Sequence, residues 1–370
     1  MLQNFHNHRR FTSALRAKAY SVRLTRNVTE QITIHAGFAK CGSSSIQAAL
    51  FHNFARLQKD GVSLFGKELK IAHASADLGV PLWFLEAARE KGEPLAQRLS
   101  DEIASVEDTN GDRVGILSAE NLARPEMAPL LAGLDQRLDV SLAFYLRPQL
   151  EWIPSAWKQW GLKRGMSLSD FVSHCIRIRR PPFKLSIETW RSLLPAAKVH
   201  VRFLIPELLT DGNPARDFFH LAGLPPNNYD IAKEPRNPSQ DFSILHVLSK
   251  NPHLFSGVHD NKLMKGLMRA LPMKFQATNI QMLSLADEAR IEESFRDENL
   301  WLLNTYCRDI DVDRIYQTYF TPREGEARYS SMTDLDLIYR CLGIILESIA
   351  ASSDQVASGD RSPKTSKPES

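Results

Sequence analysis

The sequence predicts an α/β fold with a parallel β-sheet that is flanked by helices on both faces and extended by additional C-terminal helices. Two observations support this prediction. Short apolar runs typical of buried strands alternate along the chain with longer segments of helical periodicity, and proline or glycine residues end several of these segments. The expected strands cover residues 32–36, 114–118, 140–146 and 199–204. This order of elements is typical of a parallel sheet whose two faces are both covered.

Segments with helical periodicity connect the expected strands. In the first of them, residues 46–57, the side chains of Ile46, Leu50 and Phe54 lie on one face. Further helices are expected over residues 94–106, 149–163, 168–176 and 215–222. We expect three later helices to pack around the sheet, at residues 243–249, 287–306 and 334–351.

Composition indicates how the chain is organised. With 370 residues, of which 43% are hydrophobic and 24% are charged, the chain can bury the core of one large α/β domain, expected over residues 31–350. Residues 1–30 are predicted to form a flexible basic arm, and residues 351–370, rich in Ser, Asp, Lys and Pro, a disordered tail. The alternative for the arm is a transit-like or membrane-surface segment, which leaves peripheral membrane contact open.

Several classes of protein are disfavoured by composition. A net charge of +3 is too small to argue for a nucleic acid partner. No uninterrupted apolar run approaches the roughly 20 residues that span a bilayer, so no integral membrane association is expected. The four cysteines are too widely spaced for a zinc pattern or a dense disulfide scaffold, which favours a reducing cytoplasmic compartment.

The most informative segment is residues 32–50, where an apolar strand leads through a tight turn into a helix. Gly37 and Gly42 let the backbone turn sharply, and Lys40 adds a positive charge to the turn. Three serines, at 43–45, present hydroxyl groups at the helix start, where unpaired N–H groups and the helix dipole favour an anion. The segment therefore predicts a phosphate-binding loop.

This loop differs from the familiar nucleoside-triphosphate loop, G-x-x-x-x-G-K-[ST]. Here Gly42 is followed by Ser43, and Lys40 stands two residues before the second glycine instead of directly after it. Neither strand 114–118 nor strand 140–146 ends in the aspartate that would hold a magnesium ion. Metal-assisted triphosphate chemistry is therefore disfavoured, and no metal cofactor is expected.

The loop instead resembles that of the sulfotransferase family, in which a K-[ST]-G-[ST]-[ST] loop between the first strand and the first helix binds 3′-phosphoadenosine-5′-phosphosulfate. The corresponding residues here are Lys40, Cys41, Gly42, Ser43 and Ser44. Cys41 departs from the usual Ser or Thr, which removes a hydroxyl donor but leaves the backbone N–H available. The resemblance implies a P-loop-type fold of the bacterial, carbohydrate-modifying kind, with this loop and Ser45 holding the donor.

A second motif supports the same resemblance. Arg147, at the end of strand 140–146, and Ser155, in the following helix, stand at R-x7-S spacing. In the family, an arginine and a serine so placed grip the donor's 3′-phosphate, to which an arginine can make forked, charge-assisted hydrogen bonds. Residues 236–239, Arg-Asn-Pro-Ser, loosely approximate a further family segment, which makes Arg236 another candidate contact to this phosphate.

The resemblance also suggests a general base. Members of the family that modify carbohydrates often carry a carboxylate just past the strand that corresponds to residues 114–118. Glu120 is therefore the candidate to take the proton of the acceptor, with Ser118 and Asn121 as neighbours that orient substrate or donor. Lys40 is suited to neutralise charge on the departing 5′-phosphate. The alternative role for Glu120 is a first-turn carboxylate that satisfies a helix dipole.

Other side chains have simpler expected roles. His35 is expected to be packed or hydrogen-bonded within the first strand. Trp152, Trp157 and Trp160 are expected to belong to the core or to a groove wall. A basic zone over residues 147–202 is expected to attract the anionic donor.

The motifs thus predict a metal-independent sulfotransferase that moves a sulfuryl group from 3′-phosphoadenosine-5′-phosphosulfate to an acceptor hydroxyl. A small-molecule acceptor is expected, with a carbohydrate or glycolipid preferred. Two alternatives stay open: a P-loop kinase for a small molecule, and a non-catalytic nucleotide-binding or carbohydrate-binding module. The sequence also leaves open the identity of the acceptor and the oligomeric state.

Overall fold

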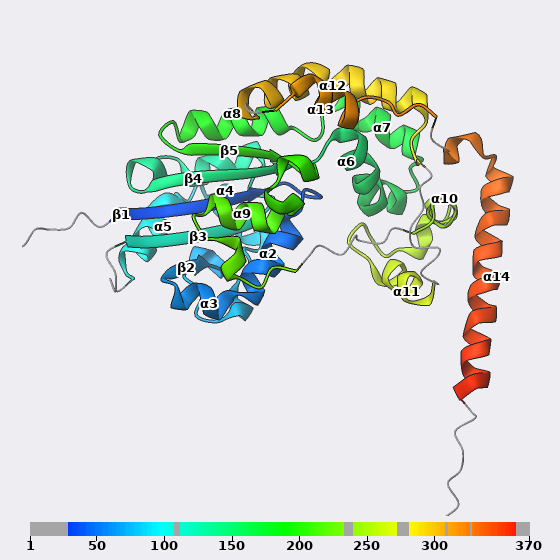
Figure 1. Cartoon of the computed structure of the whole chain (residues 1–370), viewed down its shortest axis with the longest axis horizontal. Helices are drawn as coiled ribbons and strands as arrows, with labels where there is room; N and C mark the ends of the chain where they lie inside the picture. Colours follow the sequence, from blue (N-terminus) through cyan, green and yellow to red (C-terminus); the bar gives the residue numbers. More distant parts are fainter. Residues whose placement is uncertain are drawn as a thin grey trace, which may run out of the picture.

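The computed structural model describes residues 29–106, 112–232, 240–271, 281–307, 310–325 and 328–359. Its centre is a five-stranded sheet in the order β2-β3-β1-β4-β5, in which all neighbouring strands are parallel. The strands are β1 (Thr29–Gly37), β2 (Val62–Phe65), β3 (Asp112–Glu120), β4 (Asp139–Leu146) and β5 (Lys198–Phe203). Helices cover both faces of the sheet (Figure 1), so the predicted α/β class with a parallel sheet is confirmed.

Alternating side chains of the strands point to the two faces of the sheet and form two apolar clusters. In β4, Ala143 and Tyr145 belong to one cluster, whereas Leu142 and Phe144 belong to the other. The first face is covered by α2 (Ser43–His52), α3 (Phe54–Lys59) and α9 (Pro214–Leu221). The opposite face is covered by α4 (Leu82–Lys91), α5 (Leu95–Ala104) and α8 (Phe183–Leu193).

The remaining helices lie around one end and one edge of the sheet. They are α6 (Gln149–Ala156), α7 (Leu168–Arg177), α10 (Phe242–Ser249), α11 (Lys262–Ala270), α12 (Leu285–Tyr306), α13 (Val312–Tyr319) and α14 (Asp334–Gly359). Figure 1 shows α6, α7, α10 and α11 past the carboxyl ends of the strands, and α14 as a long helix at the margin of the molecule. α12 packs against α6, α7 and β5. None of the described helices has both the length and the apolar character needed to cross a bilayer.

The predicted elements are largely present, with differences at their ends. All four predicted strands occur, and β2 was missed because its four residues are too few to establish a periodic pattern. The helix predicted over residues 46–57 begins already at Ser43 and is interrupted at Asn53. The side chain of Asn53 donates to the carbonyls of Ala49 and Asp230, and these bonds fix the interruption.

Two domain boundaries also differ from the prediction. β1 begins at Thr29, before the expected domain start at residue 31. α14 continues to Gly359, past residue 351, where the tail was expected to begin. Residues 1–28 of the predicted arm and 360–370 of the predicted tail lie outside the described residues.

The turn between β1 and α2 depends on two glycines. Gly42 has a φ of 82°, in the left-handed region that residues with a Cβ atom disfavour. Gly37 lies in close contact with its surroundings, because a Cβ atom there would be 2.6 Å from Ser43 Oγ and 3.1 Å from the carbonyl oxygen of Ala119. A side chain at position 37 would therefore overlap the start of α2 and the end of β3.

Gly37→Ala is expected to lower the free energy of unfolding by about 1–3 kcal/mol, because the added methyl group overpacks the contact with Ser43 and Ala119. The control is Gly266→Ala in α11, where a Cβ atom meets nothing within 4 Å and alanine favours the helix by up to about 1 kcal/mol. Urea unfolding followed by circular dichroism measures both effects. Equal stability of the two variants would contradict the tight packing of the turn.

Candidate functional site

A cleft of about 780 Å³ opens at the carboxyl ends of the central strands. It is lined by residues of the turn after β1, of the end of β3 and of the segment after α6, among them Lys40, Gly42, Ser43, Ser44, Glu120, Asn121, Gln159 and Trp160. β1 leads into α2 on one face of the sheet, whereas the elements that follow β3 and β4 pack on the other face. In open parallel sheets, ligands bind where the connections diverge in this way.

Two residues at the cleft have left-handed backbone conformations. Lys40 has a φ of 67° and Asn121 has a φ of 69°. The two turns are joined, because the N–H of Asn121 donates to the carbonyl of Gly37 at 2.8 Å. For a residue other than glycine such a conformation costs about 1–3 kcal/mol, and it concentrates at functional sites. The side chain of Lys40 lies in the cleft, where Nζ donates to Gln159 Oε1 at 3.2 Å.

The start of α2 supplies backbone N–H groups for an anion. The hydrogen-bond ladder of the helix begins with Ser45, whose N–H donates to the carbonyl of Gly42. The N–H groups of Gly42, Ser43 and Ser44 precede this ladder and lie at the positive end of the helix dipole. Ser44 is exposed, whereas Ser43 is buried and donates through Oγ to the carbonyl of Phe38 at 3.4 Å. Ser45 lies outside the cleft lining, and its N–H is taken by the helix.

Cys41 holds the turn after β1 against the interior of the protein. Its N–H donates to the carbonyl of Phe38 at 3.2 Å, so the expectation that this N–H is available to a phosphate is not met. Burial raises the pKa of the thiol to about 12, and the sulfur lies against the backbone N–H of Arg147. A second contact joins the same two segments, because Trp152 Nε1 donates to the carbonyl of Ala39 at 2.9 Å. The turn after β1 is thereby fixed to the corner after β4.

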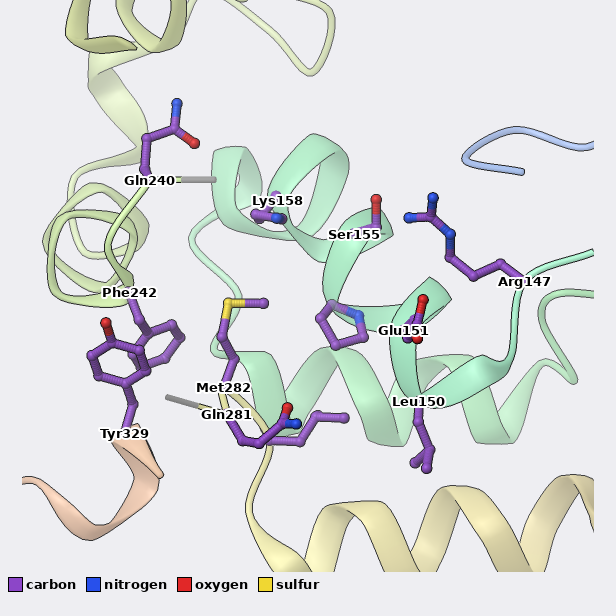
Figure 2. Close-up of a pocket in the computed structure, with 12 residues that line it drawn as sticks. Arg147, Leu150, Glu151, Ser155, Lys158, Gln240, Phe242, Gln281, Met282 and Tyr329 are labelled. Carbon is purple, nitrogen blue, oxygen red and sulfur yellow. The ribbon is translucent and has the colours of Figure 1, made fainter. Parts of the chain in front are cut away.

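A second cavity, of about 260 Å³, contains the other predicted motif. Arg147, Ser155 and Lys158 line it together with the aromatic rings of Phe242 and Tyr329. Figure 2 shows the guanidinium of Arg147 and the hydroxyl of Ser155 projecting to the same side of α6. The structure therefore brings Arg147 and Ser155 to one cavity. Arg147 Nε is buried and has no acceptor among the described residues, which leaves a donor for a ligand.

Lys158 is a further cation of the site, which the sequence analysis missed. Burial, followed by the charges of Lys40 and Arg147, lowers its pKa to about 8, so it lies within electrostatic reach of both motifs. It belongs to a π-helical turn, Trp157–Gly161, and such turns occur frequently at functional sites. The unbroken helix predicted over residues 149–163 gives no reason to select this lysine.

Lys40, Lys158 and Arg147 form a cluster of three cations whose charge suits an anion. Burial also lowers the pKa of Lys40, and the charge of Glu120 acts in the opposite direction. Positive charges held close together in a partly buried space repel one another, and an anion bound among them removes this repulsion. The cluster spans both spaces, because Lys40 lines the cleft whereas Arg147 and Lys158 line the second cavity.

Glu120 lies in the cleft near Lys40, in a position that suits a base. Ser118, by contrast, is buried and hydrogen-bonded through Oγ to His35 Nδ1 at 2.8 Å. It does not line the cleft, so the expectation that it orients a ligand there is wrong. Burial lowers the pKa of His35 to about 3, and the expected hydrogen-bonded role of this residue within the first strand is confirmed.

A side branch of about 300 Å³ extends from the cleft. The two spaces share Ala39, Asn121, Arg124, Trp152 and Arg180 as lining residues. Arg124 donates to Asn121 Oδ1 at 3.4 Å, and the guanidinium of Arg180 lies 5.6 Å from the ring centre of Trp160. The branch extends the cleft beside the turn after β1.

The other predicted residues can also be placed. Trp152 and Trp157 are buried and Trp160 lines the cleft, which confirms their expected core and groove positions. Arg236 lies outside the described residues. Across the part of the chain that the structure describes, no three His, Cys, Asp or Glu side chains are grouped so as to hold a metal ion.

Neither the comparison with protein-family models nor the search of curated proteins finds a match to this chain. The chemistry of the site is therefore what indicates the function. Its main features are the N–H groups at the start of α2, the three cations and the carboxylate of Glu120.

The affinity of the site for an anion is expected to fall as the pH rises from about 7 to about 9. Lys158, with a pKa of about 8, loses its charge in this range, and the anion binds the charged form. Above the pKa of Lys158, the loss of this one proton raises the Kd of the anion by at most about tenfold per pH unit. Sulfate is a suitable probe because its charge is constant in this range, and the fluorescence of the nearby Trp160 reports its binding.

The matched control is Lys158→Arg, which keeps the charge at all these pH values and is expected to flatten the dependence. An unchanged slope in this variant would contradict the role of Lys158. In the ligand-free protein, the stability of the fold changes with pH in the opposite direction to the anion affinity. Because the unfolded chain holds this proton more tightly, the contribution of Lys158 to stability increases as the pH rises through about 8.

Proposed function

We propose that this protein is a sulfotransferase of the P-loop type, which uses 3′-phosphoadenosine-5′-phosphosulfate to sulfate a hydroxyl group of a carbohydrate or glycolipid. The observation that carries the proposal is the meeting of both phosphate-binding motifs around Lys40, Lys158 and Arg147. One motif offers the N–H groups of a helix start and the other an arginine with a serine. A donor with phosphates at its 5′ and 3′ positions is a ligand that uses both.

The residues on each side fit one part of this donor. The start of α2, with Lys40, suits the 5′-phosphate. Arg147, with its buried and unsatisfied Nε, and Ser155 suit the 3′-phosphate. The rings of Phe242 and Tyr329, with centres 4.8 Å apart, give the second cavity an aromatic wall that suits a nucleobase.

The catalytic roles follow from position and charge. Bound at this site, the donor supplies the sulfuryl group for transfer to the acceptor oxygen. Glu120 accepts the proton of the acceptor hydroxyl, and Lys40 neutralises the charge that develops on the 5′-phosphate. The acceptor occupies the cleft and its side branch, where Trp160 offers an apolar face and Arg180 hydrogen-bond donors, as a sugar requires.

Calorimetric titration with 3′-phosphoadenosine-5′-phosphate, in the absence of magnesium, is expected to detect binding to the wild-type protein. Arg147→Ala is expected to weaken this binding roughly 10–100-fold, because it removes charge-assisted hydrogen bonds. The matched control is Arg98→Ala on α5, which removes an arginine paired with Glu93 outside both cavities and is expected to leave binding unchanged. No binding, or a preference for ATP with magnesium, would mean that the proposed function is wrong.

Turnover is expected to depend on Lys40 and Glu120. Lys40→Gly is expected to slow transfer roughly 10²–10³-fold, because a preorganised charge is lost. It is not expected to lower the melting temperature, since glycine adopts a φ of 67° more readily than lysine. Glu120→Gln is expected to slow transfer roughly 10²–10⁴-fold.

Both variants are tested by transfer of a radiolabelled sulfuryl group to a panel of sugars and glycolipids. Wild-type turnover in either variant would refute the role given to that residue. A wild-type protein that binds 3′-phosphoadenosine-5′-phosphate but sulfates no member of the panel would favour a non-catalytic binding module.

A further inference from the structure

α14 carries most of the large apolar side chains that the described part of the chain exposes. Those on this helix are Leu335, Ile338, Tyr339, Leu342, Ile345, Leu346 and Ile349. Their exposed fractions range from 42% to 66%. Figure 1 shows α14 at the margin of the molecule, away from the sheet. A contiguous apolar surface of this kind on one helix marks a site of interaction.

The spacing of these residues is that of a coiled-coil seam. Five of them follow one another at alternating intervals of three and four residues: Leu335, Ile338, Leu342, Ile345 and Ile349. Such a repeat keeps one stripe of a helix facing a second helix over several turns. Tyr339 and Leu346 lie next to this stripe and widen it. We call these seven residues the α14 seam, and their pattern indicates that another helix covers them.

Another side of α14 is already used within the chain. Leu337, Cys341 and Ile344 are buried, and α14 packs against α10. Arg340 donates to both carboxylate oxygens of Asp241, with the shortest contact at 2.7 Å. The helix is therefore fixed to its own chain by one side while the seam stays exposed.

We propose that the α14 seam is covered by α14 of a second copy of this chain, so that two identical stripes pair in a symmetric dimer. At 42% to 66% exposure each side chain offers on the order of 100 Å², so that two copies bury at most about 1,400 Å² when the whole seam is covered. Stable interfaces bury about 1,200–2,000 Å². The seam is thus large enough to hold a dimer, and the inference does not rest on the proposed enzymatic activity.

The charges of α14 argue against a lipid surface as the occupant. Helices that lie on membranes are rich in lysine and arginine on their polar face. The described acidic residues of α14 include Asp334, Asp336 and Glu347, whereas Arg340 is bound to Asp241. An acidic polar face is repelled by anionic headgroups, so a second protein helix is the better match.

The mass of the full-length protein in solution tests the proposal. Light scattering is expected to give twice the chain mass of 41.8 kDa at micromolar concentration. Leu342→Glu, at the centre of the seam, is expected to raise the dimer dissociation constant roughly 100-fold or more, because it places unpaired charges in the interface. Ile345→Glu is expected to have the same effect. The matched control is Leu185→Glu on α8, which makes the same substitution at a leucine that is 59% exposed and lies outside α14, and it is expected to keep the dimer.

Three outcomes overturn the proposal. The first is a wild-type protein that stays monomeric throughout the concentration range. The second is a dimer that persists in both seam variants, which would place the interface elsewhere. The third is a monomer that sediments with vesicles of phosphatidylcholine and phosphatidylserine, which would identify a lipid surface.

A measurement on the wild-type protein keeps the test valid even where a seam variant fails to fold, as judged by circular dichroism. Amide hydrogen exchange of α14 is expected to slow as the protein concentration rises, because pairing protects the helix. Exchange that is independent of concentration would count against pairing of the α14 seam.

Discussion

The site depends on the packing of the turn after β1 against the corner after β4. Cys41 is buried against the backbone of Arg147, and the indole N–H of Trp152 holds the carbonyl of Ala39. These contacts fix the position of Lys40 relative to Arg147, although the two cations are far apart in the sequence. They also account for the residue at position 41. The side chain at position 41 points into the core, which favours a small and weakly polar group. The thiol of Cys41 is such a group, and it contributes no donor to a ligand.

The partly buried cations of the site favour the binding of an anion. The pKa values of Lys40 and Lys158 are both lowered, chiefly by burial, and at Lys40 the attraction of Glu120 outweighs the repulsion of Arg147. His35 in β1 adds no positive charge near the turn, because burial lowers its pKa to about 3 and keeps the imidazole neutral. A polyanion relieves the repulsion and stabilises the folded state through linkage.

Sequence patterns predicted the structure correctly where an apolar run was long or where a residue type has a specific chemistry. Apolar runs located four strands, and the spacing of Arg147 and Ser155 placed both at one cavity. Patterns failed where distant contacts decide the local structure. The break at Asn53 depends on Asp230, and the direction of Lys158 depends on a π-helical turn. Ser118 was expected in the cleft, but it lies deeper in the sheet, where the strand register pairs it with His35.

The α14 seam and the second cavity are connected through one arginine. Arg340 of α14 binds Asp241, which precedes Phe242 in the chain. The guanidinium of Arg340 also lies 5.9 Å from the ring centre of Tyr329. Phe242 and Tyr329 both line the cavity, although α14 itself contributes no lining residue. Arg340 therefore links α14 to the residues of the aromatic wall. If pairing of two copies and binding of a ligand in the cavity favour the same position of Arg340, each raises the affinity of the other by the same factor.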